Sequence, residues 1–189
     1  MPADSQHFAL TDKVALVTGG TRGLGREMAL AFARAGADVV VASRKRGACE
    51  ATAREIEGLG RRALSVACHV GEWDQLDALV DAAYGHFGRV DVLVNNAGMS
   101  PLYPSLIEVS EALWDKVLAV NLKGPFRLSA LVGTRMAAGT GGSIINVSSV
   151  AAIRPTPMEA PYAAAKAGLN SLTVACAQAF GPKVRVNCI

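Results

Sequence analysis

The chain has 189 residues, of which 51% are hydrophobic and 19% are charged. This length fits one domain, and the apolar share is large enough for a substantial buried core. The 19 Lys and Arg residues and 16 Asp and Glu residues give a formal net charge of +3, with one basic triplet at Arg44-Lys45-Arg46. This balance argues against a nucleic-acid-binding protein, and no apolar run has the length of a membrane span.

The first ten residues lack the secretory pattern of a cationic segment followed by an apolar one. We expect a disordered leader at 1–10, one domain at 11–189 and a cytoplasmic location. The four cysteines, at positions 49, 68, 176 and 188, have neither C-x-x-C nor metal-ligand spacing. They are typical of small buried residues in a reducing compartment, and we expect no metal site.

Strand-like apolar runs alternate with helical stretches along the chain. The runs cover residues 14–18, 38–43, 63–67, 90–95, 143–148 and 184–187. The helical stretches cover residues 24–35, 48–58, 73–87, 111–138 and 161–180, with a break expected near Gly124-Pro125. This alternation predicts an α/β fold with three layers, in which helices cover both faces of a Rossmann-like, doubly wound parallel sheet. Ligands of such sheets bind at the carboxyl ends of the strands, where the strand order reverses.

The first strand-like run leads into a glycine-rich turn and then into a helical stretch. Glycine allows positive φ and a close backbone approach, so the start of that helix is a candidate site for the pyrophosphate of a dinucleotide. A flexible connection is the alternative for a glycine triplet alone, and the flanking strand and helix favour the dinucleotide. The expected contact residues are Gly19, Thr21, Arg22, Gly23, Leu24 and Gly25.

Tyr162 and Lys166 lie four residues apart in an alanine-rich helical stretch that starts at Pro161, and Ser149 precedes Tyr162 by thirteen residues. One helical turn places the ammonium beside the phenol, and the positive end of the helix dipole adds to its effect. Both favour the phenolate, the form that a general base requires. A half-buried tyrosine beside a solvated lysine is the plainer interpretation of an isolated pair, but the preceding strand and serine turn favour catalysis.

Five elements in this order resemble the short-chain dehydrogenase/reductase family, from Thr11 to the last residue. They are Thr18-Gly19-x-x-x-Gly23-x-Gly25, Asn95-Asn96-Ala97-Gly98, Asn121, Ser149 and Tyr162-x-x-x-Lys166. The residues in these motifs are most similar to those of 3-oxoacyl-carrier-protein reductase-like members. The resemblance implies an NAD(P)-dependent oxidoreductase that acts on a small carbonyl or alcohol compound.

The resemblance also implies a role for each matching residue. Tyr162 is the general acid or base, Ser149 holds the substrate oxygen, Lys166 binds the nicotinamide ribose and assists Tyr162, and Asn121 anchors a water in a proton relay. Asn96, Ala97 and Gly98 contact the cofactor. The helical stretches at 111–138 and 161–180 form the interface of a homodimer or homotetramer. A turn or cap role is the plainer interpretation of these residues, and Asn95 is expected to bridge strands rather than to join the site.

The end of the second strand-like run bears on the choice of cofactor. An acidic residue there selects NAD(H), whereas Ser43-Arg44 has no carboxylate and Arg22 adds a second cation. We expect NADP(H) to be preferred and NAD(H) to be possible, with two solvated arginines as the alternative. After the third strand, the family usually has an Asp or Asn that contacts adenine, whereas this chain has His69 and Val70. We expect the Val70 backbone to make this contact rather than the His69 side chain. A surface histidine in a loop is an equal alternative for His69.

The last run, at 184–189, resembles the sixth strand of the family, whose members continue into a Pro-Gly turn, a mobile lid and a seventh strand. We therefore expect this chain to be shorter than the working protein, with a natural short form as the alternative. An inactive cofactor-binding sensor or interaction module is the alternative function. Segments 99–106 and 151–160 are rich in Pro, Met, Leu and Tyr, which favours an apolar or amphipathic carbonyl substrate.

Overall fold

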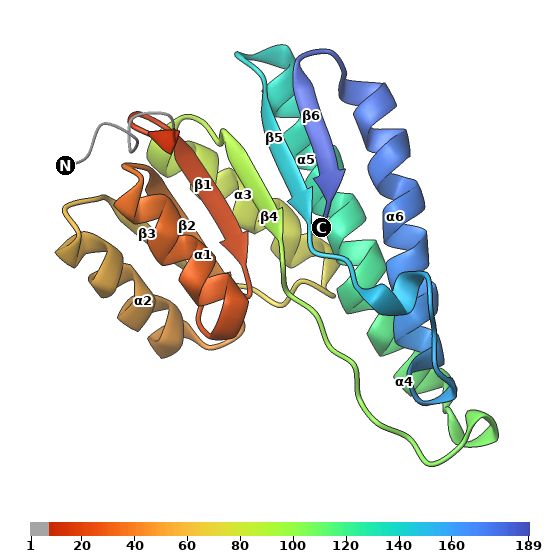
Figure 1. Cartoon of the computed structure of the whole chain (residues 1–189). Coiled ribbons are helices and arrows are strands. Elements are labelled where there is room, and N and C mark those ends of the chain that lie inside the picture. The colour runs from red at the N-terminus through yellow and green to blue at the C-terminus, as the bar shows by residue number, and fades with distance from the viewer. Residues whose placement is uncertain (1–7) are drawn as a thin grey trace.

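Six parallel strands form one sheet at the centre of the computed structural model, which describes residues 8–189 (Figure 1). The strands are β1 (Val14–Thr18), β2 (Asp38–Ser43), β3 (Ala63–Ala67), β4 (Val92–Asn95), β5 (Gly142–Asn146) and β6 (Val184–Cys188). They lie in the order β3-β2-β1-β4-β5-β6, so the order reverses between β1 and β4. The prediction of a doubly wound sheet is confirmed, and the carboxyl ends of β1 and β4 are its expected ligand crevice.

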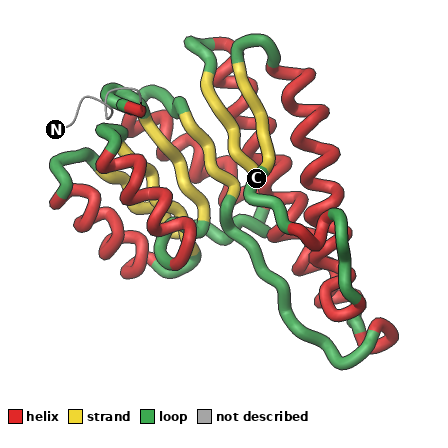
Figure 2. Tube along the Cα trace, in the orientation of Figure 1, coloured by secondary structure: helices red, strands yellow, loops and turns green. Residues whose placement is uncertain are grey.

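Helices cover both faces of the sheet, as Figure 2 shows. They are α1 (Gly23–Arg34), α2 (Arg46–Gly58), α3 (Trp73–Phe87), α4 (Glu111–Leu118), α5 (Gly124–Ala138) and α6 (Ala160–Phe180). Alternation along β2 divides the core into two layers, because successive side chains point to opposite faces of a strand. Val39 and Val41 pack with residues of α1 and α2, whereas Val40 and Ala42 pack with residues of α3, α5 and α6.

The helix is interrupted next to Gly124-Pro125, as expected, but the interruption is a π-helical turn rather than a break in the chain of helical residues. A π-helical turn, Ala119–Lys123, joins α4 directly to α5, and Pro125 lies in the first turn of α5. Pro125 has no N–H to donate to the preceding turn, and it lies where the hydrogen-bond pattern changes from π-helical to α-helical. Gly124 is required for a different reason, since a Cβ at this position would lie 2.1 Å from the carbonyl oxygen of Val70.

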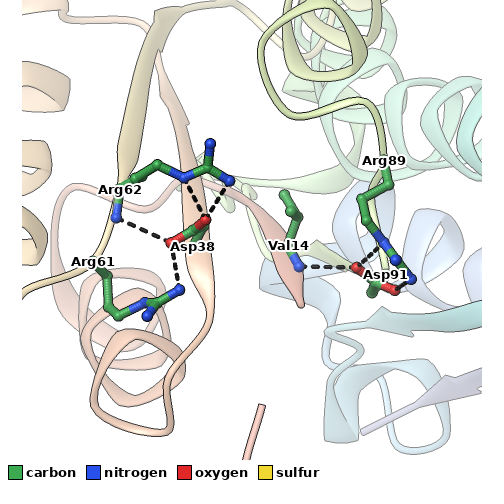
Figure 3. Close-up of polar contacts among 6 residues, drawn as sticks. All are labelled: Val14, Asp38, Arg61, Arg62, Arg89 and Asp91. Carbon is green, nitrogen blue, oxygen red and sulfur yellow. Dashed lines mark hydrogen bonds and ion pairs between the residues drawn. The ribbon is translucent and has the colours of Figure 1, made fainter. Parts of the chain in front are cut away.

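Two carboxylates tie strands together at the amino ends of the sheet, opposite the crevice (Figure 3). Asp38 accepts hydrogen bonds from the Arg62 N–H at 3.0 Å and from Arg61 Nη2 at 2.8 Å. Asp91 accepts a hydrogen bond from the Val14 N–H at 2.9 Å, which links the start of β4 to β1. Both carboxylates are buried, and their partners identify them as structural.

Residues 1–7 of the expected leader lie outside the described residues, and the Leu10 N–H donates to the Ala35 carbonyl at 2.7 Å. Cys49, Cys68 and Cys176 are buried free thiols, as expected. Cys188 is exposed, contrary to expectation, because it ends the edge strand β6. None of the helices within residues 8–189 combines the length and the apolar character needed to cross a bilayer.

Candidate active site

The turn between β1 and α1 presents bare backbone toward the crevice. Gly19 and Gly23 have φ of +66° and +51°, a region that favours glycine. A Cβ on Gly23 would meet no atom within 4 Å, so this part of the turn is open, whereas a Cβ on Gly25 would lie 2.3 Å from the Gly19 carbonyl oxygen. Arg22 precedes α1 without a side-chain cap, and the first turn of α1 has no acidic residue. The first N–H groups of α1 therefore fit an anionic group such as a pyrophosphate.

Thr18, which the sequence analysis did not place in the site, connects the two strands at the reversal. Its hydroxyl donates to the Val94 carbonyl at 3.2 Å and accepts from the N–H groups of Asn96 and Ala97, both at 3.1 Å. The Asn96 side chain donates back to the Thr18 carbonyl at 2.9 Å. Asn96 therefore braces β1 with its side chain. A threonine directly before the glycine turn was the available signal for this role.

The tip of β2 lies beside the glycine turn, because Thr21 Oγ1 donates to Ser43 Oγ at 3.1 Å. The next residue on each segment, Arg22 and Arg44, is exposed. Arg44, after β2, and Arg22, in the glycine turn, are therefore neighbouring cations, and neither segment has a carboxylate between them. Leu24, the remaining turn residue expected to contact a cofactor, is also exposed, at 71%.

His69 folds back on its own loop. Its Nδ1 accepts from the Gly71 N–H at 3.1 Å, and its own N–H donates to Gln75 Oε1 at 2.8 Å. Val70 is buried, with its carbonyl against Gly124. These contacts give the His69 ring and the Val70 carbonyl structural partners within the protein.

The two serines after β5 make different contacts. Ser148 Oγ donates to Asn170 Oδ1 of α6 at 2.5 Å. Ser149 accepts from the Ala151 N–H at 3.2 Å and caps the short 3₁₀ helix Val150–Ala152. That bond uses a lone pair of the Ser149 oxygen, so the hydroxyl proton remains available for donation.

Tyr162 and Lys166 lie one turn apart near the start of α6. The start of α6 is on the same side of the molecule as the carboxyl ends of the strands (Figure 1). Lys166 Nζ donates to the Val147 carbonyl at 2.6 Å and lies 5.6 Å from the centroid of the Tyr162 ring. The Lys166 side chain is only 3% exposed, and burial lowers its pKa to about 8. Tyr162 itself is half-buried.

Asn121 is fully buried in the π-helical turn and holds the segment after β4. Its Oδ1 accepts from the Met99 N–H at 3.1 Å, and its Nδ2 donates to the Met99 carbonyl at 2.8 Å. A Cβ on Gly98 would lie 3.0 Å from Asn121 Oδ1 and 3.9 Å from Lys166 Nζ. The structure therefore brings Gly98, Asn121 and Lys166 together from three distant parts of the chain. Single π-helical turns are frequent at functional sites.

Asn95 bridges the central strands, as expected. Its Nδ2 donates to Asn146 Oδ1 at 2.8 Å and to Ser129 Oγ at 3.1 Å. These bonds connect β4 with β5 and α5, and Asn95 is only 2% exposed. Asn95 therefore supports the site from within the core.

Tyr103, another residue that the sequence analysis missed, joins two loops at the carboxyl end of the sheet. Its hydroxyl donates to the Pro157 carbonyl and accepts from the Ala160 N–H, both at 2.6 Å. Segments 99–106 and 151–160, expected to line a substrate pocket, are thereby fastened to each other. Several apolar side chains near this junction remain exposed, namely Leu102, Leu106, Ile107, Val150, Ile153 and Met158.

A family model described as short chain dehydrogenase matches residues 13–189. The chain belongs to the short-chain dehydrogenase family. The proteins named dehydrogenase/reductase SDR family member 4 from Homo sapiens and Pongo abelii are each 39% identical to it over 181 residues, which is 95% of this chain. The chain spans 65% of the length of each of these relatives.

Solved structures of two oxidoreductases that hold a nicotinamide cofactor have the same fold. A metagenomic short-chain oxidoreductase in complex with NADP is 38% identical, with a TM-score of 0.91 over 95% of this chain and 81% of that one. An NAD+-bound xylitol dehydrogenase is 29% identical, with a TM-score of 0.90 over 94% of this chain and 69% of that one. Both cofactors thus occur among proteins similar to this chain.

Proposed function

We propose that this protein is an oxidoreductase that moves a hydride between NADP(H) and a carbonyl or secondary alcohol compound. One domain, residues 11–189, binds the dinucleotide and carries the catalytic residues. The observation that carries the proposal is the buried Lys166 ammonium, held by the Val147 carbonyl one helical turn from Tyr162. Few structural roles require a buried cation beside a phenol at the carboxyl end of a parallel sheet.

Tyr162 donates its proton to the carbonyl oxygen during reduction and removes the hydroxyl proton during oxidation. Ser149, whose hydroxyl proton is available, donates a hydrogen bond to the same oxygen and orients it. Lys166 stabilises the phenolate, and its pKa of about 8 lets it exchange a proton near neutral pH. Asn121 anchors a water that relays this proton to solvent. When bound, the nicotinamide supplies or accepts the hydride.

The residues at the reversal of strand order would hold the cofactor. Backbone of the glycine turn fits the pyrophosphate, and Ala97, Gly98, Tyr162 and Lys166 would contact the nicotinamide end. The Val70 backbone would lie against the adenine. Arg22 and Arg44 follow the bonded pair Thr21 and Ser43 and would contact a 2′-phosphate, which supports NADP(H) over NAD(H). Of the two similar solved structures with a named cofactor, one holds NADP and the other holds NAD+.

We also propose an assembly of two or four copies and an apolar or amphipathic substrate. A groove of about 860 Å³ runs along α4, the π-helical turn and α5, with Leu118, Leu122, Phe126 and Leu172 among its lining residues. Large apolar patches mark interaction surfaces, and a second copy is the occupant that the resemblance implies. The exposed apolar side chains near Tyr103 support the substrate class. Buried free thiols support a cytoplasmic location.

The test is a panel of ketones, 3-oxoacyl thioesters, sugars and steroids, assayed on the full-length protein by nicotinamide absorbance with NADPH and NADH. Tyr162→Phe should lower kcat on any active substrate by about 10² or more, the scale of lost acid-base catalysis, and should leave cofactor affinity unchanged. Tyr84→Phe, a half-buried tyrosine on α3, is the matched control and should stay within about twofold of wild type.

Retained turnover in Tyr162→Phe would remove Tyr162 from the mechanism. A protein that binds NADPH and turns over no compound of the panel would instead support the inactive sensor or interaction module.

A further inference from the structure

Three consecutive residues at the end of β5 each form a hydrogen bond with α6. The bonds join Asn146 Nδ2 to Thr173 Oγ1 at 2.9 Å, Val147 O to Lys166 Nζ at 2.6 Å, and Ser148 Oγ to Asn170 Oδ1 at 2.5 Å. The partners on α6 are spaced by four and three residues, so they follow one face of the helix. Tyr162, four residues before Lys166, lies on the same face. A continuous polar stripe of α6 thus begins with the proposed catalytic pair.

The buried end of this stripe belongs to a bonded network. Thr173 is 5% exposed and Asn146 is 2% exposed. The Thr173 hydroxyl also donates to the Leu169 carbonyl at 2.8 Å, and Asn146 Oδ1 accepts from Asn95 Nδ2 at 2.8 Å. Hydrogen bonds in such surroundings are directional and costly to break, so each one restricts the helix in rotation and in translation.

Apolar packing also holds α6, most closely where the Phe180 ring lies against Gly133 of α5 and Leu122 lies against Gly168. Its buried side chains are mostly small, and Leu169 is the single large aliphatic residue among them. The polar bonds to residues 146–148 add directional contacts along the part of α6 next to Tyr162 and Lys166, so they are suited to adjust how far both side chains project toward the carboxyl end of the sheet.

We propose that Asn170 and Thr173 are positioning residues for the reaction, acting on Tyr162 and Lys166 through the rotation and axial placement of α6. This inference rests on the proposed function. Neither residue touches the reacting atoms in this mechanism. Their contribution is geometric, and misplacement of a catalytic group by about 1 Å is enough to lower a rate by about 10²-fold.

Thr173→Val and Thr173→Ser form the first experiment, on the full-length protein. Valine has the shape of threonine without the hydroxyl, and serine restores the hydroxyl. Thr52→Val in α2 is the matched control, because Thr52 is 2% exposed and donates to the Ala48 carbonyl four residues earlier, as Thr173 does to Leu169. Turnover is expressed per cofactor-binding site, so that an unfolded fraction does not lower it.

We expect Thr173→Val to lower kcat at least tenfold, Thr173→Ser to remain within about threefold of wild type, and Thr52→Val to leave kcat unchanged. Equal kcat in Thr173→Val and Thr52→Val would overturn the proposal for Thr173. Equal loss in the serine and valine variants would do the same, because the hydroxyl would then not be the cause.

Asn170→Ala separates positioning from stability. Asn170 is half-buried in an alanine-rich helix, and the higher helix propensity of alanine offsets much of the lost hydrogen bond to Ser148, so the melting temperature should change little. We expect kcat to fall at least threefold all the same. An unchanged kcat would remove Asn170 from the proposal, and this variant decides the question if Thr173→Val does not fold.

A crystal structure of each variant provides a readout that does not depend on activity. The distance from Lys166 Nζ to the Val147 carbonyl oxygen should lengthen from 2.6 Å to more than 3.5 Å in Thr173→Val and return in Thr173→Ser. An unchanged distance overturns the positioning role whether or not the protein reduces a carbonyl. Inactivity of the wild type on every substrate refutes the proposed function alone.

Discussion

At the scale of single residues, Lys166 is the side chain whose chemistry depends most on the fold. An isolated lysine has a pKa of 10.5, and burial within α6 lowers this value to about 8. Its one hydrogen-bond acceptor in the described part of the chain is the neutral Val147 carbonyl, which does not offset the loss of water around the charge. The fold therefore destabilises the charged form of Lys166, and such a shifted pKa is typical of functional positions.

The pH dependence of stability should reveal this lysine. Below pH 8, Lys166 is protonated in both the folded and the unfolded chain. Between pH 8 and pH 10.5, Lys166 has lost its proton in the folded chain but keeps it in the unfolded chain. The unfolded chain therefore binds more protons in this range, and the free energy of unfolding rises with pH. Relative to Lys166→Met, the free energy of unfolding of wild type should rise by about 2 kcal/mol from pH 8 to pH 10. Denaturant titrations at both pH values measure it. Lys45→Met, at an exposed site, should keep the wild-type rise.

Arg44 is the residue through which cofactor choice can be tested. A charge-assisted phosphate contact contributes about 1.5 to 3 kcal/mol, so Arg44→Asp should move the ratio of kcat/KM for NADP(H) over NAD(H) at least tenfold toward NAD(H). Arg54→Asp, exposed two turns into α2, is the control and should leave this ratio unchanged. A wild type that already prefers NAD(H), or an unmoved ratio in Arg44→Asp, would show that Arg44 does not bind the phosphate.

At the scale of elements, the two ends of the sheet have different tasks. The carboxyl ends carry the glycine turn, Asn96 and the serines, whereas the amino ends are closed by ion pairs (Figure 3). Burial by itself raises the pKa of Asp38, but the hydrogen bonds from Arg62 and the charges of Arg61 and Arg62 outweigh it and lower that pKa. Asp38 thus fastens the start of β2 to the start of β3.

Asp38→Asn should destabilise the fold by about 1 to 3 kcal/mol at pH 7, because it removes charge-assisted hydrogen bonds from a buried position. The pKa of Asp38 is lower in the folded chain than in the unfolded chain. The stability difference between wild type and Asp38→Asn is therefore complete above the unfolded pKa of Asp38, and it disappears as the pH falls through the folded pKa. Denaturant midpoints at pH 7 and pH 3 test this. Glu55→Gln, which breaks the exposed pair with Arg26, should cost less than about 1 kcal/mol.

At the scale of the whole molecule, the helix layers differ in what they leave exposed. The groove along α4 and α5 presents Phe126, which is 41% exposed and lies 6.4 Å from the ring of Trp73. On the opposite face, Leu59, the residue that follows α2, is 43% exposed. A grouped apolar surface favours association, whereas single exposed apolar residues are ordinary.

We expect the full-length protein to be a dimer or tetramer at micromolar concentration and Phe126→Glu to weaken this assembly, because the substitution replaces an exposed aromatic ring of the groove with a charge. Light scattering over a dilution series measures the mass. Leu59→Glu is the control of equal exposure and should leave the mass unchanged. A monomeric wild type would contradict the assembly.

Much of the fold could be predicted because its signals are local. The runs that became β1, β2 and β3 are short apolar segments bounded by polar or glycine residues, and their bounds agree with the prediction. The carboxyl end of β5 could not be placed from local signals of this kind. The strand ends at Asn146, where the Val147 carbonyl bonds to Lys166, nineteen residues further along the chain.

Motif spacing placed Tyr162 beside Lys166 because one helical turn is a local property of the backbone, and the reversal of strand order followed from the alternation of elements. Spacing carries no information on partners from distant segments. The contacts of Thr18 with Asn96, of Tyr103 with Pro157 and of Asn146 with Thr173 exist because the sheet brings separate strands and helices together. The sequence by itself thus determined which chemical groups are present and in which order. The tertiary structure alone decided their burial and their hydrogen bonds, because both depend on atoms that are remote along the chain.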